Sequence, residues 1–170
     1  MANPAPKVTL QGNPLTLAAT PVDVGAAAPD ATVRSGLPDT LKISSGQGKV
    51  RIITTAPSVD TAVCAKQLKA FNDRAKSLDN VEIWYVTRDL APALGRFTKE
   101  NSIDNVRTFS DAIEQEFGKN WGLVIQELGV LARTVYVVDT QGKITYREFV
   151  SEVAQEPDYG AALDAAKAAS

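Results

Sequence analysis

The sequence of 170 residues contains no histidine and only one cysteine, Cys64. The absence of histidine excludes Ser-His-Asp and Cys-His activation of a nucleophile, and also the usual mixed His/Cys zinc sites. A single cysteine excludes an internal disulfide, so stability must come from packing, and any disulfide must join two molecules. Any group that activates a nucleophile here must be a hydroxyl, a helix N-terminus or a cation other than histidine. We expect neither a cofactor nor a metal site.

Positive charge is also scarce and scattered. The net charge is −2, and no cluster of lysine or arginine marks a surface for nucleic acid or for an anionic membrane. Small neutral partners are therefore favoured. No apolar run reaches the length of a membrane span, and the start of the chain, Met1 to Lys7, has no signal-peptide core. These features predict a cytoplasmic protein.

The length and the 44% hydrophobic content fit one domain over residues 1–170 better than two small ones. Residues 1–20 predict an N-terminal β-hairpin around Gln11–Pro14. The pattern of the remaining chain indicates strands alternating with helices, then a hairpin and a last helix capped by Asp158. The expected strands are 50–54, 81–86, 105–109, 134–138 and 143–149, and the expected helices are 60–78, 91–100 and 112–117. This order predicts an α/β fold with a mixed central sheet flanked by helices.

Cys64 lies near the start of the expected helix 60–78. It begins an apolar stripe that continues, at helical spacing, through Leu68, Phe71, Ala75 and Leu78. In the first helical turn, unpaired N–H groups and the helix dipole favour a thiolate, which a free cysteine with a pKa of about 8.5 rarely forms near neutral pH. Thr61, three residues earlier, is expected to reach the sulfur with its hydroxyl.

Both residues also have ordinary structural interpretations. Free cysteines are among the most buried residue types and are usually inert, so periodicity alone favours a structural Cys64. Thr61 is equally suited to capping the helix.

A resemblance to a known family changes this balance. The segment Pro57–Gln67 resembles the active-site signature of the thiol peroxidase (Tpx) subfamily of peroxiredoxins, whose core is Pro-x-x-x-Thr-x-x-Cys. Three further segments are similar to parts of the same subfamily, in the same order: Gln11–Pro14, Gly129–Asp139 and Glu156–Tyr159. The similarity covers nearly the whole chain.

The resemblance implies a thioredoxin-like fold and a homodimer that reduces hydrogen peroxide and organic hydroperoxides, with thioredoxin or a small thiol as reductant. Cys64 would be the peroxidatic thiolate that becomes a sulfenic acid. Thr61 would hold the thiolate and orient the peroxide, Arg133 would stabilise the thiolate and the developing charge, and Pro57 would shield the pocket from water. Without the resemblance, Arg133 would be interpreted as a surface arginine.

The subfamily pattern breaks at one position. Its resolving cysteine normally follows Arg-Phe, but here Arg96-Phe97 is followed by Thr98, and the nearby Thr87–Pro92 also departs from the usual sequence. Three interpretations stay open: a natural one-cysteine enzyme resolved by an external thiol, an engineered or diverged form that turns over poorly, or a disulfide between Cys64 residues of two subunits. Unlike serine, threonine is not isosteric with cysteine, so it is a poor choice for a deliberate replacement. This favours a natural variant.

Other classes of function remain as alternatives. The strongest is a non-enzymatic redox sensor or a thioredoxin-like interaction module, which would use Cys64 stoichiometrically. A thiol-disulfide oxidoreductase is disfavoured, because Cys64–Gln67 lacks the second cysteine of a Cys-x-x-Cys pair.

Overall fold

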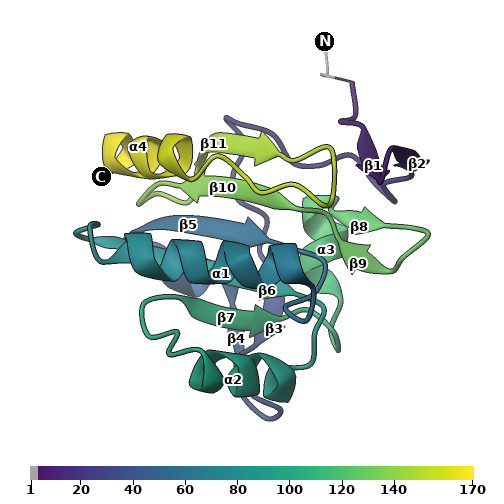
Figure 1. Cartoon of the computed structure of the whole chain (residues 1–170). Coiled ribbons are helices and arrows are strands. Elements are labelled where there is room, and N and C mark those ends of the chain that lie inside the picture. The colour runs from purple at the N-terminus through teal and green to yellow at the C-terminus, as the bar shows by residue number, and fades with distance from the viewer. Residues whose placement is uncertain (1–3) are drawn as a thin grey trace.

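The computed structural model describes residues 4–170; residues 1–3 of the predicted N-terminal arm lie outside the described part. A seven-stranded mixed sheet forms the centre, in the order β11-β10-β5-β6-β7-β3-β4 (Figure 1). Its strands are β3 (Thr32–Arg34), β4 (Thr40–Lys42), β5 (Val50–Thr55), β6 (Val81–Thr87), β7 (Arg107–Ser110), β10 (Thr134–Val138) and β11 (Ile144–Phe149). β5, β6 and β7 are parallel neighbours, and β10 is antiparallel to β5.

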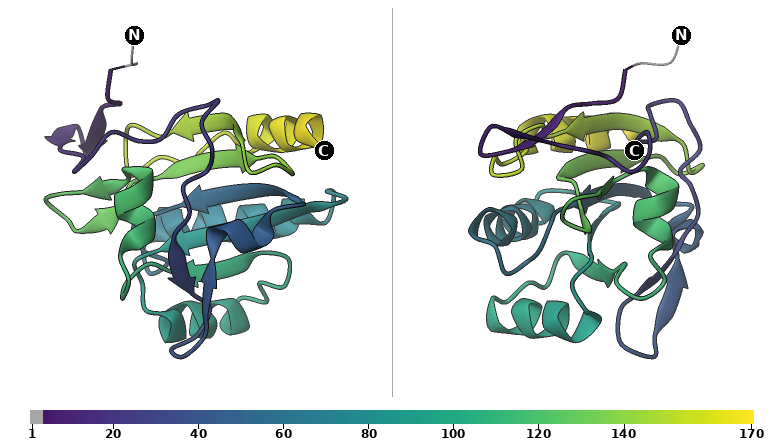
Figure 2. Two further views of the ribbon diagram at one scale, coloured as in Figure 1. Left: turned by 180° about the vertical axis from the view of Figure 1, so that it is seen from behind. Right: turned by 90° about the vertical axis from the view of Figure 1, so that its right-hand side faces the viewer.

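Helices cover both faces of this sheet (Figures 1 and 2). The helices are α1 (Ala62–Ala75), α2 (Ala91–Glu100), α3 (Glu116–Trp121) and α4 (Tyr159–Ala169), with a 3-10 helix, η1, at Ile43–Gly46. One core cluster joins α1, α2 and α4 to one face, and a second joins α3 and η1 to the other. β5 is therefore buried along its whole length, as a β-branched run between two helical layers should be.

Two small hairpins complete the fold. β1 (Val8–Leu10) pairs with β2 (Asn13–Leu15), and β8 (Val124–Ile125) pairs with β9 (Val130–Leu131). The predicted N-terminal hairpin is confirmed, but Asn13 and Pro14 lie in its second strand and not in the turn. The tight turn needs only Gln11 and Gly12, which both adopt positive φ.

The predicted α/β architecture and most of its elements are confirmed, and α2 has the expected bounds of Ala91–Glu100. Asp158 caps α4 as expected by accepting a hydrogen bond from the N–H of Ala161. The helix predicted over 112–117 is wrong, because α3 begins only at Glu116. The buried carboxylate of Asp111 accepts the N–H groups of Phe117 and Gly118, which fixes the helix start several residues later.

Candidate active site

Cys64 occupies the first turn of α1. β5 ends at Thr55, a short loop follows, and α1 begins at Ala62, so Cys64 is the third residue of the helix. Its side chain is fully buried, and the thiol is free. The predicted position at a helix start is confirmed. Unpaired N–H groups and the positive end of the helix dipole surround this turn, an environment that favours a negatively charged sulfur.

Arg133 reaches the same sulfur from a distant part of the chain. It lies between β9 and β10, and pairing of Thr134 with Thr55 places it beside the end of β5. Nη2 of Arg133 lies 3.4 Å from Sγ of Cys64, and the side chain is only 1% exposed. The interpretation of Arg133 as a surface arginine is therefore wrong. The only thiol and a buried guanidinium, 69 positions apart in the sequence, are in contact.

Two acceptors hold this guanidinium in place. The carbonyl of Val153 accepts hydrogen bonds from Nε and Nη2 of Arg133, at 3.0 and 2.7 Å. Oε1 of Gln67 accepts from Nη1 at 2.6 Å. These acceptors engage all three guanidinium nitrogens of Arg133. They therefore fix the orientation of the guanidinium group relative to the sulfur.

Gln67 is a site residue that the sequence interpretation missed. It is buried one helical turn after Cys64, and its Nε2 donates to Oγ1 of Thr54 and to the carbonyl of Thr55. It therefore links α1, the end of β5 and Arg133. The signal was present, since a polar residue three positions after Cys64 lies on the buried side of the helix.

Thr61 and Pro57 lie in the segment that leads into Cys64. Thr61 is the N-cap residue of α1, but its hydroxyl makes no capping bond and instead donates to the carbonyl of Ser58 at 3.0 Å. Within residues 4–170, no hydrogen bond joins Thr61 to Cys64. The role of Thr61 in holding the thiolate stays a prediction, while its oxygen keeps lone pairs available to accept a hydrogen bond. Pro57 is buried in the loop before Cys64.

A pocket of about 420 Å³ opens beside this loop. One side of it is formed by the loop before α1, with Pro57 and Thr61, and by Arg133. The rest of its wall is mostly apolar and comes from the N-terminal hairpin, α1, the β8–β9 hairpin and the segment after β11: Leu10, Val63, Leu128, Val130, Val153 and Ala154. A small or alkyl-bearing molecule in this pocket would lie against Arg133, the residue in contact with the sulfur.

Asp89 holds the loop that precedes Cys64. Its carboxylate accepts hydrogen bonds from the hydroxyl of Ser58, at 2.6 Å, and from the N–H of Val59, at 2.8 Å. The hydroxyl of Thr87 also donates to it, at 2.7 Å. The segment that departs from the subfamily sequence, Thr87–Pro92, thus still fixes the cysteine loop.

Tyr85 is a further buried polar group near the thiol. Its hydroxyl donates to the backbone carbonyl of Cys64 at 3.2 Å. Burial raises the pKa of Tyr85 well above its usual value, and the negative charge of Cys64 adds to this effect. Tyr85 therefore stays protonated and acts as a donor, not as a base.

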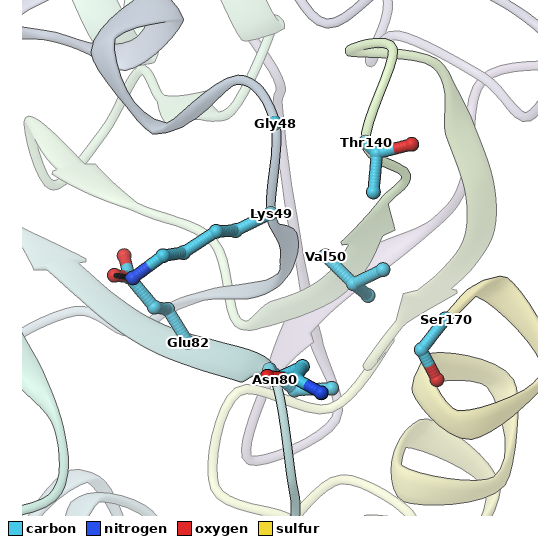
Figure 3. A pocket seen from close by; sticks show the side chains of 8 residues that line it. Gly48, Lys49, Val50, Asn80, Glu82, Thr140 and Ser170 are labelled. Atoms are coloured by element: carbon cyan, nitrogen blue, oxygen red, sulfur yellow. Dashed lines mark hydrogen bonds and ion pairs between the residues drawn. The ribbon is translucent and has the colours of Figure 1, made fainter.

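A second pocket, of about 650 Å³, lies at the other end of the sheet (Figure 3). It is lined by the start of β5, the start of β6 and the end of α4, including Lys49, Glu82 and Ser170. Lys49 and Glu82 form an ion pair of 3.0 Å there. Within residues 4–170, no group of three or more Cys, Asp or Glu could hold a metal ion, and no helix is long and apolar enough to cross a membrane.

Comparisons with known proteins identify the family of this chain. The redoxin family model matches residues 23–163. A thiol peroxidase of Oceanobacillus iheyensis is 44% identical over 92% of this chain and 95% of its own length, and one of Bacillus subtilis is 41% identical over 95% and 97%.

Solved structures give the same picture. The crystal structure of a peroxiredoxin-like protein from Aquifex aeolicus is 33% identical, covers 96% of this chain and 97% of its own, and has a TM-score of 0.90. A thiol peroxidase from Chromobacterium violaceum, at 18% identity over 92% of each chain, has a TM-score of 0.84 and supports the fold. The predicted thioredoxin-like fold and the resemblance to the thiol peroxidases are confirmed. The chain therefore belongs to the redoxin family and, within it, to the thiol peroxidases.

Proposed function

We propose that the chain is a thiol-dependent peroxidase that reduces hydrogen peroxide and organic hydroperoxides through Cys64. The observation that carries this proposal is the contact of 3.4 Å between Nη2 of Arg133 and Sγ of Cys64 at the start of α1. Cys64 belongs to the apolar cluster on this face of the sheet, but it also contacts a buried cation at a helix N-terminus, and this combination favours a reactive thiolate.

The first half of the reaction needs only these groups and the peroxide. The thiolate of Cys64 attacks one peroxide oxygen, an S–O bond forms and the O–O bond breaks. Cysteine sulfur is oxidised to a sulfenic acid, and the peroxide is reduced to water or an alcohol after the leaving oxygen takes up a proton. Arg133 stabilises the thiolate and then the charge that develops on the peroxide oxygens.

Thr61 and Pro57 have supporting roles in this scheme. The hydroxyl proton of Thr61 points to the Ser58 carbonyl, so the Thr61 oxygen is free to accept the O–H of the bound hydroperoxide. Pro57 is buried in the wall of the pocket, presents no N–H group and limits the access of water. The apolar remainder of the wall supports organic hydroperoxides as substrates, because it can bury an alkyl group.

The second half of the reaction requires a thiol from outside the chain. Thr98 occupies the position of the resolving cysteine, and its hydroxyl donates to the carbonyl of Gly95 in α2. An external thiol attacks the sulfenic acid of Cys64, forming a mixed disulfide and releasing water. A second thiol then reduces that disulfide, which restores Cys64 and leaves the two reductant sulfurs joined.

Intact-mass spectrometry tests the first half. Low hydrogen peroxide should add one oxygen to the wild-type protein within seconds and leave the Cys64→Ser variant unchanged. Slow addition to the wild type, or equal addition to the variant, would contradict a peroxidatic Cys64.

Steady-state peroxide consumption tests the second half. Thioredoxin with its reductase, and separately a small dithiol, would be supplied as the reductant. Turnover with either supports an enzyme and identifies the kind of thiol that resolves it. Rapid oxidation without turnover under both conditions would instead indicate a stoichiometric redox sensor.

The setting of the enzyme is also proposed. A peroxidase that depends on external thiols works where thiols are kept reduced, which supports a cytoplasmic location.

We propose a homodimer of single-domain chains, residues 1–170, in which residues 1–20 form a hairpin extension that contributes Leu10 to the pocket. Sedimentation analysis of the reduced protein tests the dimer, and a monomer at micromolar concentration would contradict it.

A further inference from the structure

Glu152 receives an unusual number of hydrogen bonds for a partly exposed carboxylate. Oε2 accepts from the hydroxyl of Thr9, at 2.8 Å, and from the N–H of Gly12, at 3.1 Å. Oε1 accepts from the N–H of Gln11, at 3.0 Å, and from the N–H of Ala154, at 3.2 Å. The hairpin lies beside the segment that follows β11 (Figure 1), and this one side chain joins the hairpin turn to that segment.

The backbone around Glu152 is tied to the same hairpin strand. The N–H of Thr9 donates to the carbonyl of Ser151, and the N–H of Val153 donates to the carbonyl of Thr9. Thr9 and Glu152 form a parallel β-bridge between these segments. The peptide groups on both sides of Glu152 are thus fixed by β1.

The next residue, Val153, connects this junction to the active site. Its carbonyl accepts both the Nε and the Nη2 of Arg133, and that same Nη2 contacts the sulfur of Cys64. Val153 has its N–H held by Thr9 and its carbonyl engaged with Arg133, so its orientation depends on how firmly β1 is docked.

We propose that Glu152 is a positioning residue for the peroxidase reaction: by clamping the hairpin turn onto the segment after β11, it orients the Val153 carbonyl that aims Arg133 at Cys64. It touches neither the sulfur nor the substrate, and it acts through a chain of hydrogen bonds. The proposal rests on the peroxidase function proposed above.

We call the four hydrogen bonds that Glu152 accepts from Thr9, Gln11, Gly12 and Ala154 the clamp. Its electrostatics are consistent with this role. The N–H of Gly12, the hydroxyl of Thr9 and the N–H of Gln11 lower the pKa of Glu152 to about 2, so it is ionised throughout the physiological range. A charged acceptor makes stronger hydrogen bonds than a neutral one. The clamp is therefore permanent at neutral pH and is not a switch.

The variant Glu152→Gln tests the clamp with almost no change in shape. Glutamine replaces one acceptor oxygen by a donor NH2, which would face the hydroxyl and N–H donors of the hairpin turn. We expect the oxidation rate of Cys64 to fall about tenfold, equally for hydrogen peroxide and for cumene hydroperoxide. The pH profile of Cys64 alkylation by iodoacetamide should move to higher pH, because Arg133 is held less firmly over the sulfur.

Glu127→Gln is the matched control. Glu127 also ties the N-terminal segment to a loop, by accepting the N–H of Thr16 at 2.9 Å, but this contact does not lead to Val153. Its variant should keep the wild-type oxidation rate and alkylation profile. Thr9→Val removes one hydrogen bond from Glu152, and a smaller fall, about threefold, is expected even if Glu152→Gln does not fold.

Each outcome bears on the clamp. Wild-type rates and alkylation in Glu152→Gln, or in Thr9→Val if the first variant does not fold, would overturn it. A loss confined to cumene hydroperoxide, with unchanged alkylation, would also overturn it, because the clamp would then shape only the pocket wall through Leu10. Absence of peroxide oxidation in the wild type would refute the proposed function instead, while the alkylation profiles would still report the clamp.

Discussion

Two arginines are almost completely buried, one within the start of the central strand β5 and one beside its end, and only the second contacts the thiol. Arg51, at the start of β5, is 1% exposed, donates to the carbonyl of Ile43 and lies 5.0 Å from the ring centroid of Trp84. Arg133, beside the end of β5, is equally buried but contacts a carbonyl, an amide and the sulfur of Cys64. Burial of a cation therefore does not identify a site, whereas a nucleophile within its reach does.

The two ends of the sheet differ in the same way. Burial lowers the pKa of Arg51, opposed only partly by the charges of Glu82 and Asp30, and its Nε has no hydrogen-bond partner within residues 4–170. The nearby pocket is larger than the one beside Cys64, yet its polar wall is the Lys49–Glu82 ion pair (Figure 3), whose lysine side chain is 63% exposed. The larger pocket is thus not the one beside the thiol, and the candidate site is distinguished by its buried, hydrogen-bonded guanidinium and not by its volume.

Replacing each of the two arginines by methionine should give the largest difference in the rate of Cys64 oxidation. Arg133→Met should slow peroxide oxidation of Cys64 by about 10²–10³-fold, because the donor to the developing charge is lost. Arg51→Met should leave this rate unchanged. Quenched-flow mass spectrometry measures both rates. Equal slowing in the two variants would mean that the sheet, and not the contact with sulfur, controls the reaction.

Two polar residues on α1 give the next largest contrast. Gln67→Leu removes the Oε1 acceptor of Arg133 and should reduce the oxidation rate about tenfold. Asn72→Leu, at a buried position further along the helix, removes the acceptor of the N–H groups of Asp104 and Asn105. It should lower the melting temperature and leave the rate intact. A normal rate in Gln67→Leu would remove Gln67 from the site.

Acid should weaken the clamp, because protonation of Glu152 weakens its hydrogen bonds to the hairpin turn. Because the pKa of Glu152 is lowered to about 2 from its ordinary 4.5, its contribution to stability is complete above pH 4.5 and is lost as the pH falls through about 2. Wild-type protein should melt at a higher temperature than Glu152→Gln at neutral pH, with a difference that shrinks between pH 4.5 and 2. A constant difference in melting scans across this range would contradict the assigned shift.

The smallest effect is expected at the exposed ion pair. Lys49→Met breaks a pair whose lysine side chain is 63% exposed, so the free energy of unfolding should change by less than about 1 kcal/mol. The rate of Cys64 oxidation should not change, and urea titration with quenched-flow kinetics checks both. A slower rate would show that the far end of the sheet is coupled to the thiol.

The sequence predicted local features well, because they depend on neighbouring residues. The apolar stripe placed Cys64 at the start of a helix, and the strand-helix order predicted the mixed sheet. The alternating runs around Gly142 predicted the β10–β11 hairpin. The helix expected over 112–117 failed for a tertiary reason: the Asp111 carboxylate, in a buried turn, sets where α3 begins. The resemblance supplied Cys64, Thr61, Pro57 and Arg133 and the expected role of Arg133 beside the thiolate, but not the groups that hold Arg133 in place.

Sequence alone thus determined the type of nucleophile, its place in a helix and the absence of a second cysteine or any histidine to assist it. Only the tertiary structure decided that Arg133 meets this thiol, that Gln67 and the Val153 carbonyl aim it, and that Glu152 docks the hairpin behind them. The physical reason is the range of the interactions. Helix propensity and capping act over a few residues, whereas the register of β5 against β10 joins residues nearly 80 positions apart, Thr55 and Thr134.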